Sequence, residues 1–407
     1  MQLLYPKSQL LPAKAIIAVL IVLTLSFIAR IHAAGCEHFG SKCPKNGPCC
    51  NQGWCSADIK FCAMNCDPVN SFSADSCLPT PGCVSFRDNF DNAATLMPQG
   101  NFSGNPFLAN WTSDFEPNNA YIKDGKLVLE IRQDRTKLNE YGKYQGFGTT
   151  VSSVRSLHKG NITARLRTAS SSPGVVSSWI TRNVQGDELD FEWVGRSPRQ
   201  VQTNWYQNGV FDWSRGVFSD LPELDDASAS FHEYTIGWEA DQVRWFVDGR
   251  CVRVLELNGT NVFGRSQQWH FSVWDGGSGS PSTAAWAGGP TNWTGPDSVY
   301  RMEVDWVEVQ CAQEMTEEQR KAEWDRWNSR PNRTLVTTTV MGGGVTTTQG
   351  TPTTTMSGGV TTTHGTPTPT SNVSAGPSKK VGGEVWILSV VVMAVGLAFF
   401  ELGCNRA

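Results

Sequence analysis

Residues 186–195 read GDELDFEWVG, in which three carboxylates alternate with apolar residues. Successive side chains of a β-strand point to opposite faces, so Glu188, Asp190 and Glu192 would project from one face. Three neighbouring acids repel one another and shift each other's pKa values, which points to a functional role. Two carboxylates that flank a scissile glycosidic bond are the chemistry that most naturally needs this array. A metal site and an acidic surface strand without function are the alternatives.

Short alternating segments surround this strand and indicate the fold that positions it. Between about residue 84 and residue 311 they are separated by turns rich in Gly, Asn and Asp. Examples are residues 126–131, 162–168, 233–238, 243–247 and 302–309. Strands at this spacing, with almost no long helical periodicity, predict an all-β sandwich of about 225 residues.

The composition narrows the class of ligand. Of the 407 residues only 18% are charged and the formal net charge is -4, so no nucleic-acid partner is expected. The 16 Trp are more than we expect one core of this size to need. Because sugars stack on aromatic rings, the composition favours a carbohydrate-binding cleft.

Candidate cleft residues lie on the strand after the acids and in a glycine-rich segment near residue 280. They are Asn204, Trp205, Tyr206, Trp274, Thr283 and Trp286. An aromatic among turn-forming glycines meets a ligand more readily than an aromatic within a strand does. We expect Trp238, Trp245 and Trp306, on alternating strands, to lie in the core. His158, His232 and His270 are interpreted as structural.

Both ends of the chain have the pattern of processing signals. Residues 1–34 have the basic, apolar and small-residue order of a secretory signal peptide, with an uncleaved anchor as the alternative. Residues 375–407 end in an apolar tail that is typical of a glycosylphosphatidylinositol (GPI) signal, with attachment at Ser374. A single-pass membrane anchor is the alternative. Either reading sends the chain into the secretory pathway, and the GPI reading places it on the outer face of the plasma membrane.

The region before this tail resembles a stalk. Residues 341–355 recur as residues 356–370 in a Thr- and Pro-rich repeat within the predicted stalk, residues 331–374. A flexible linker is the other interpretation. Residues 313–330 predict a short helix that packs back on the main domain. Seven glycosylation sequons agree with the secretory route: Asn101, Asn110, Asn161, Asn258, Asn292, Asn332 and Asn372.

Nine of the 12 cysteines lie between Cys36 and Cys83, in a segment with few aliphatic residues. In an oxidising compartment this spacing predicts a disulfide-rich module over residues 35–83, and zinc binding is the competing interpretation. The connectivity does not follow from the spacing. One arrangement has eight cysteines within the module, a pair between Cys251 and Cys311, and Cys83 left over.

Residues 43–62, CPKNGPCCNQGWCSADIKFC, resemble the hevein-type chitin-binding module, the family 18 carbohydrate-binding module. The resemblance implies that Trp54 and Phe61 stack on an N-acetylglucosamine unit. It also places Asn51 at the position of a sugar-binding serine. A structural cap that has lost its ligand is the alternative.

Residues 175–195 and the acidic triplet resemble glycoside hydrolase family 16, and within it the fungal CRH cell-wall transglycosylases. The resemblance implies a concave β-jelly roll over residues 84–312 that needs no metal and no cofactor. It assigns Glu188 as nucleophile, Asp190 as helper and Glu192 as acid/base. It further implies a GPI-anchored enzyme, expected to be monomeric, that transfers chitin to β-glucan. A purely hydrolytic glucanase or chitinase and a non-catalytic wall lectin remain open.

Overall fold

The computed structural model describes residues 36, 42–169, 172–224, 226–259, 263–293 and 299–328. These residues belong to one compact unit, Met1–Leu335. The predicted signal peptide, stalk, GPI signal and Ser374 lie outside the described residues. Within the described ranges, no helix has the length and apolar character needed to cross a membrane.

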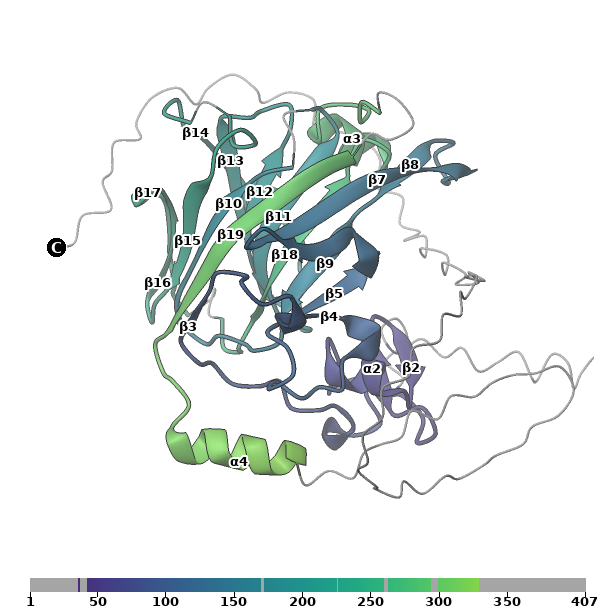
Figure 1. Cartoon of the computed structure of the whole chain (residues 1–407), viewed down its shortest axis with the longest axis vertical. Helices are drawn as coiled ribbons and strands as arrows, with labels where there is room; N and C mark the ends of the chain where they lie inside the picture. The colour runs from purple at the N-terminus through teal and green to yellow at the C-terminus, as the bar shows by residue number, and fades with distance from the viewer. Residues whose placement is uncertain are drawn as a thin grey trace, which may run out of the picture. The chain divides into compact units, whose positions relative to one another are not determined.

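Two largely antiparallel sheets form a jelly-roll β-sandwich, which confirms the predicted all-β fold (Figure 1). The nine-stranded sheet has the order β17 (Arg250–Glu256), β16 (Gln242–Val247), β15 (His232–Trp238), β10 (Gly160–Arg167), β19 (Val299–Cys311), β7 (Lys126–Leu138) and β6 (Ala120–Lys123), with β3 (Phe86–Asp88) beside β19 and β8 (Tyr144–Phe147) beside β7. The eight-stranded sheet has the order β14 (Val217–Asp220), β13 (Gln200–Tyr206), β12 (Glu188–Val194), β11 (Val175–Arg182), β18 (Gln268–Asp275), β9 (Thr149–Ser153), β5 (Trp111–Phe115) and β4 (Leu96–Pro98).

Short helices connect these strands. They are η2 (Ala93–Thr95), η3 (Gln99–Asn101), η4 (Pro117–Asn119), η5 (Trp213–Arg215) and α3 (Pro281–Trp286). All five strand segments predicted from the sequence coincide with strands of the structure, namely β7, β10, β15, β16 and β19. The alternating pattern predicts these strands correctly because one face of each strand packs into the sandwich while the other stays more exposed.

Tryptophan rings fill the space between the sheets. The buried ones are Trp111, Trp179, Trp193, Trp238, Trp245 and Trp269. The core prediction is thus confirmed for Trp238 and Trp245, but it is wrong for Trp306. That ring is only partly buried and stacks under the Arg87 guanidinium, 3.8 Å from the ring centroid. The large number of tryptophans therefore reflects the core more than a ligand.

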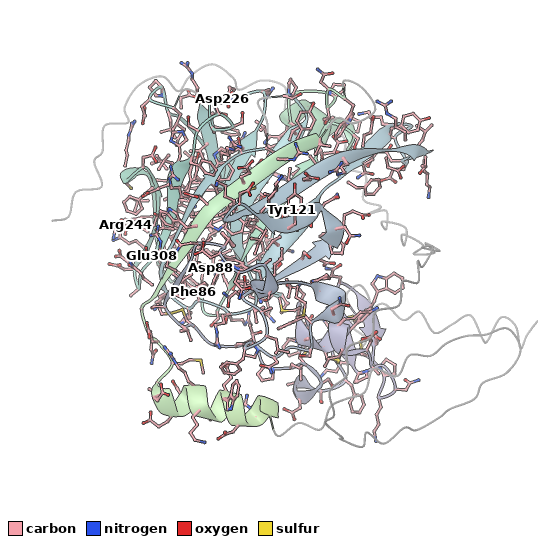
Figure 2. The ribbon with its side chains drawn as sticks, in the orientation of Figure 1. Phe86, Asp88, Tyr121, Asp226, Arg244 and Glu308 are labelled. Atoms are coloured by element: carbon pink, nitrogen blue, oxygen red, sulfur yellow. A yellow bond between two sulfur atoms is a disulfide. The ribbon has the colours of Figure 1, made fainter. Side chains whose placement is uncertain are left out.

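Strand β3 joins the two sheets near the start of the sandwich. The Asp88 carboxylate accepts hydrogen bonds from Trp111 Nε1 at 2.9 Å and Asn110 Nδ2 at 3.0 Å, and Figure 2 labels Asp88 next to Phe86. Just before β3, Cys83 forms a disulfide with Cys311 at the end of β19. The predicted pair between Cys251 and Cys311 is therefore wrong, and Cys83 is not left over. This disulfide closes the first and last strands of the sandwich against each other.

The small N-terminal module contains β1 (Cys49–Asn51), β2 (Trp54–Ser56), α2 (Ile59–Ala63) and η1 (Ala74–Ser76). Its eight cysteines form four disulfides: Cys36–Cys50, Cys43–Cys55, Cys49–Cys62 and Cys66–Cys77. The sulfur atoms of Cys36, Cys43 and Cys55 lie within 4.8 Å of one another. Because all three belong to disulfides, they offer no thiolate to zinc. The disulfide interpretation of the module is confirmed.

Both ends of the described chain pack on the sandwich. Met64 of the module shares an apolar cluster with Phe102 and Val154. At the other end α4 (Glu317–Asn328) confirms the predicted helix. It packs back through Glu323, which accepts a hydrogen bond of 3.0 Å from Arg155 Nη2, and through Trp324.

Candidate active site

The hairpin of β11 and β12 presents the three acids. Its turn is ordered by Asn183, whose Oδ1 accepts from the backbone N–H of Gln185 at 3.0 Å and of Asp187 at 3.1 Å. Gly186 has φ +81°, and a Cβ there would lie 2.4 Å from Gly209 Cα. Only glycine tolerates both the left-handed backbone and this close approach. The turn thereby fixes the start of β12, where Glu188 lies.

Stacked rings on the inner face set the orientation of β12. Phe191 stacks on Trp179 of β11 at 5.7 Å and on Trp193 at 5.8 Å between ring centroids. Leu189, Phe191 and Trp193 of β12 are buried on the inner face. Because side chains alternate along a strand, Glu188, Asp190 and Glu192 point to the opposite face. This face of the eight-stranded sheet is called the acidic face below.

Glu188 lies beside a cation. Arg182, its register partner on β11, places Nε 3.3 Å from Glu188 Oε2. Burial holds the pKa of Glu188 above its ordinary value, and the charge of Arg182 and a hydrogen bond from Asp190 offset part of this effect. Arg182 and Asp190 therefore favour the ionised form of Glu188, which is the form a nucleophile needs.

Asp190 occupies the centre of the row and is 1% exposed. Burial, together with the charges of Glu188 and Glu192, holds the pKa of Asp190 well above its usual range. The protonated carboxyl hydrogen-bonds to Glu188. Its Oδ1 has no hydrogen-bond partner among the residues that the structure describes. This geometry agrees with the predicted helper role, because a neutral Asp190 supports a charged Glu188.

Glu192 has the environment of an acid. Burial, and next the charge of Glu188, raise the pKa of Glu192 to about 7. A carboxyl group with a pKa near 7 holds a proton at mildly acidic pH and can release it during a reaction. Neighbouring carboxylates with such different environments match the division of roles in a glycosidase.

The next strand, β13, contributes to the acidic face through every second residue. Asn204 lies opposite Asp190 and Tyr206 opposite Glu188 in the register. Asn204 Nδ2 donates to Tyr206 Oη at 2.9 Å, and both side chains are largely buried. Trp205 lies on the other face, where its ring meets Phe263 of the core. The predicted substrate contact of Trp205 is therefore wrong, because the alternation of the strand turns this ring away from the acids.

Trp274 and Trp286 form a stacked pair beside the Glu192 end of the acidic face. Their ring centroids are 5.8 Å apart, and Trp286 Nε1 donates to Gln202 Oε1 at 2.8 Å. Gln202 lies opposite Glu192 in the register. Ser280 caps α3, the short helix that contains Trp286, and its Oγ lies 2.8 Å from the hydroxyl of Thr283 in the first turn. The structure brings the two rings to the site, and sugar contacts by Trp274, Trp286 and Thr283 stay predictions.

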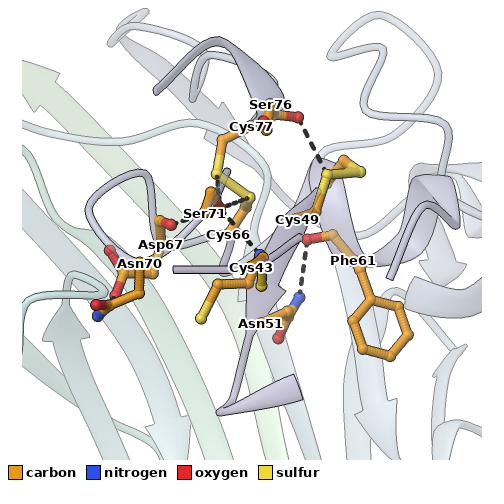
Figure 3. Close-up of a disulfide and its surroundings, with 12 residues drawn as sticks. Cys43, Cys49, Asn51, Phe61, Cys66, Asp67, Asn70, Ser71, Ser76 and Cys77 are labelled. Atoms are coloured by element: carbon orange, nitrogen blue, oxygen red, sulfur yellow. Dashed lines mark hydrogen bonds between the residues drawn. A yellow bond between two sulfur atoms is a disulfide. The ribbon is translucent and has the colours of Figure 1, made fainter. Parts of the chain in front are cut away.

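Of the three predicted sugar-binding residues in the small module, one is buried and two have accessible rings. Asn51 is 6% exposed, and its Nδ2 donates to Met64 O at 2.6 Å and, as Figure 3 shows, to Phe61 O at 3.5 Å. Its amide therefore holds the backbone of residues 61–64, and the expected sugar contact of Asn51 is wrong. Trp54 is 46% exposed and Phe61 is half-buried, so both rings remain candidates.

Three further polar residues lie on the acidic face, and none of them was predicted from the sequence as a site residue. Arg182 and Gln202 are the contacts of Glu188 and Trp286 described above. The five-residue turn between Arg182 and Glu188 could have indicated that they face each other across a hairpin. His270 is the third: its Nδ1 lies 2.8 Å from Ser152 Oγ, and burial lowers the pKa of His270 to about 4. It is therefore a neutral residue near neutral pH.

Replacing Arg182 by Ala is expected to shift the acidic limb of the pH–rate profile to higher pH. Glu188 must be ionised to act as a nucleophile, and Arg182 lowers its pKa. Without the guanidinium, Glu188 becomes protonated at a higher pH. Initial rates on a glycan substrate from about pH 4 to pH 8 measure the shift. Arg182→Lys keeps the charge and serves as the control. Superposable profiles for Arg182→Ala and the parent would contradict this role.

A β-sandwich with two unequal carboxylates on one strand defines the general class of glycosidase-type enzymes. Comparison with known proteins gives the family: residues 107–308 match the model for "Glycosyl hydrolases family 16", and the sandwich belongs to that family. "Congo red hypersensitive protein 2" of Saccharomyces cerevisiae is 33% identical over 307 residues, which are 72% of this chain and 62% of that protein.

Two further proteins are similar to parts of this chain. "Crh-like protein 2" of Aspergillus fumigatus is 32% identical over 270 residues, 63% of this chain and 57% of that protein. The chain thus spans about three fifths of the length of these curated relatives. The solved structure "Apo Crh5 transglycosylase" is 25% identical, with 58% of this chain and 89% of that chain covered and a TM-score of 0.47.

Proposed function

We propose that the protein is a retaining transglycosylase of the fungal cell wall that cleaves β-1,4-linked chitin and transfers it to β-glucan. The unequal environments of Glu188 and Glu192 are the observation that carries the proposal. One carboxylate is supported in its charged form by Arg182, and the other has a pKa of about 7.

In the first half of the reaction Glu188 attacks the anomeric carbon of the donor. The bond from this carbon to the leaving oxygen breaks, and Glu192 gives its proton to that oxygen. The shortened glycan leaves, and the remaining sugar is held as an ester on Glu188. Asp190, neutral beside Glu188, donates its hydrogen bond and limits the repulsion in the row.

In the second half an acceptor hydroxyl attacks the same carbon. Glu192, now ionised, takes the proton of this hydroxyl, and Glu188 leaves as a carboxylate. Water in place of the hydroxyl would give hydrolysis. The stacked Trp274 and Trp286 beside Glu192 offer an apolar platform on which an acceptor sugar can displace water. This platform is our reason for proposing transfer.

A product assay tests the reaction. The full chain receives chitin oligosaccharides with and without labelled β-glucan oligosaccharides, and the products are analysed by mass spectrometry. Label joined to N-acetylglucosamine units is the expected result. Shortened chitin without a joined product would replace the proposal with a hydrolase. No turnover of either polymer would favour a wall lectin.

We propose that the small module holds the enzyme on chitin through Trp54. Trp54→Ala is expected to weaken retention on insoluble chitin about 3- to 10-fold, because an exposed ring loses its stacking contact with the sugar. Pull-down on chitin beads measures it, and Val69→Ala, an exposed apolar residue of the same module, is the control. Unchanged retention would instead support a structural cap.

We further propose secretion, GPI anchoring at Ser374 and action as a monomer at the outer cell surface. Secretion and anchoring rest on the sequence pattern of residues 1–34 and 375–407. Release of the protein from cells by a phosphatidylinositol-specific phospholipase tests the anchor. Retention after that treatment would favour a membrane-spanning tail.

A further inference from the structure

Large apolar side chains stay exposed beside the acidic face, at the edge of the eight-stranded sheet that β14 forms. Phe211 and Trp213 precede β14 and Phe218 lies within it, with exposed fractions of 58%, 78% and 55%. These three residues are called the aromatic shelf. Concentrated exposed apolar surface on a soluble domain marks a binding site.

The loop that carries the shelf is fixed at its start to the catalytic hairpin. The N–H of Asn208 donates to Asp187 Oδ1 at 2.9 Å, and the N–H of Gly209 donates to Gly186 O at 2.9 Å. Both acceptors belong to the turn that leads into Glu188. Phe211 also contacts Tyr206 of the acidic face, with ring centroids 5.2 Å apart. The shelf is thus placed relative to the acids by direct contacts.

The other end of the loop is held from the opposite sheet. Arg253 of β17 donates from Nη2 to Arg215 O at 2.8 Å. Arg215 stacks over Trp205 at 4.0 Å and pairs with Asp212, at 3.0 Å between Nε and Oδ2. These contacts flank Trp213, yet its ring remains in solvent. Because burying such a ring would stabilise the fold, a well-held exposed ring indicates contact with a ligand.

The strand register connects the shelf to the acids. Phe218 lies opposite Gln202, and Gln202 lies opposite Glu192. The side chain of Phe218 therefore points to the same side of the sheet as Glu192, two strands away. A Cβ at Gly216 would lie 3.2 Å from Trp213 O and within van der Waals contact of Asn204 and Phe218, at 3.9 Å and 4.0 Å. The shelf loop therefore approaches the β13 residues of the acidic face closely at this glycine.

We propose that the aromatic shelf is an outer subsite that stacks on the apolar faces of β-linked hexopyranose units, two or more sugars from the bond that is cleaved. This inference rests on the proposed function, because it assumes that a glycan crosses the acidic face. A glycan is favoured over a protein partner by the continuity of the shelf with that face. The shelf then selects long glycans over short ones.

The test measures how affinity depends on glycan length. All variants carry Glu188→Gln, which stops turnover, and Trp54→Ala, which removes stacking by the small module. Chitin and β-glucan oligosaccharides of two to six sugars are titrated by calorimetry against the full chain. Trp213→Ala should weaken binding of the longest glycan about 3- to 10-fold, with less than about 2-fold change for the shortest. Trp213→Phe should retain most of the affinity.

Matched variants separate the outcomes. Trp324→Ala removes another exposed tryptophan, on α4, and should leave every affinity unchanged. Equal affinities of the parent and Trp213→Ala for long glycans would overturn the shelf and leave the proposed function intact. Equal losses at all lengths would overturn it as well, because they indicate damage to the central site. No binding of either glycan series by the parent would contradict the shelf and the proposed function together.

Discussion

The Glu188→Gly variant should lose transfer activity by at least about 10⁴-fold, because no other group can form the ester with the anomeric carbon. Arg182 stays beside the empty position, so the site remains able to attract an anion. Azide is a small anionic nucleophile that fits the space left by the carboxylate. Adding azide should restore turnover of a donor with a good leaving group, and the product should be an α-glycosyl azide.

Two controls make this result specific to Glu188. Glu318→Gln changes an exposed carboxylate on α4 and should leave the rate unchanged. Asp190→Asn keeps a hydrogen-bond donor beside Glu188, so it should lower the rate but show no rescue by azide. Azide rescue in Asp190→Asn but not in Glu188→Gly would transfer the nucleophile role to Asp190. A β-glycosyl azide, in which the configuration of the donor is retained, would contradict attack by azide from the position of Glu188.

The strand that carries the site could be predicted because its pattern has a physical cause. In residues 188–193 an acidic side chain alternates with a large apolar one. A sheet that is buried on one face leaves no other register for such a strand. The same alternation predicted β7, β10, β15, β16 and β19. Local periodicity is therefore sufficient for the elements and for the face on which the acids lie.

The errors concern residues whose role depends on contacts between distant segments. Trp205 follows Asn204 directly, and only its parity along β13 excludes it from the acidic face. The side-chain amide of Asn51 donates a hydrogen bond to the backbone carbonyl of Met64, which lies 13 residues further along the chain. Cys83 and Cys311 are 228 residues apart, and their pairing requires that β3 and β19 be neighbours. No local pattern contains this information.

The roles of several tryptophans could not be predicted from the sequence either. The tryptophan count suggested a sugar cleft, but six of the rings fill the core. The exposed Trp213 was not singled out, although it follows an Asn-Gly turn at residues 208–209. Composition does not distinguish a ring that packs from a ring that binds, because burial depends on where the strand lies in the sheet. Exposure in the folded chain makes that distinction.

The rate of the Glu192→Gln variant on natural glycans should be about 10²- to 10⁴-fold lower than that of the parent, because the leaving oxygen no longer receives a proton. Burial raises the pKa of Glu192 to about 7, so the parent rate should fall as the pH rises above that value. The alkaline limb should be absent from the residual activity of Glu192→Gln. Donors with a good leaving group need no proton and should retain most of the rate of glycosyl-enzyme formation. An unchanged alkaline limb would assign it to another group.

The same variant should be more stable than the parent at neutral pH. Because the pKa of Glu192 is raised in the folded state, that state binds more protons than the unfolded chain between about pH 4.5 and pH 7, and the parent loses stability as the pH rises through this window. Glutamine has no charge to bury, so Glu192→Gln should gain up to about 3 kcal/mol at neutral pH and little at about pH 4.

The matched control for this gain in stability is Glu130→Gln. Glu130 is also buried, but hydrogen bonds from Tyr121, Arg301 and Arg132 outweigh the effect of burial and hold its pKa below the ordinary value. Its charge therefore stabilises the folded state at neutral pH, and Glu130→Gln should lower the melting temperature where Glu192→Gln raises it. Thermal unfolding of the three chains at two pH values measures both signs. A lower melting temperature for Glu192→Gln at neutral pH would mean that its charge is stabilised by groups other than those of the acidic face, and that it is not the reservoir of the catalytic proton.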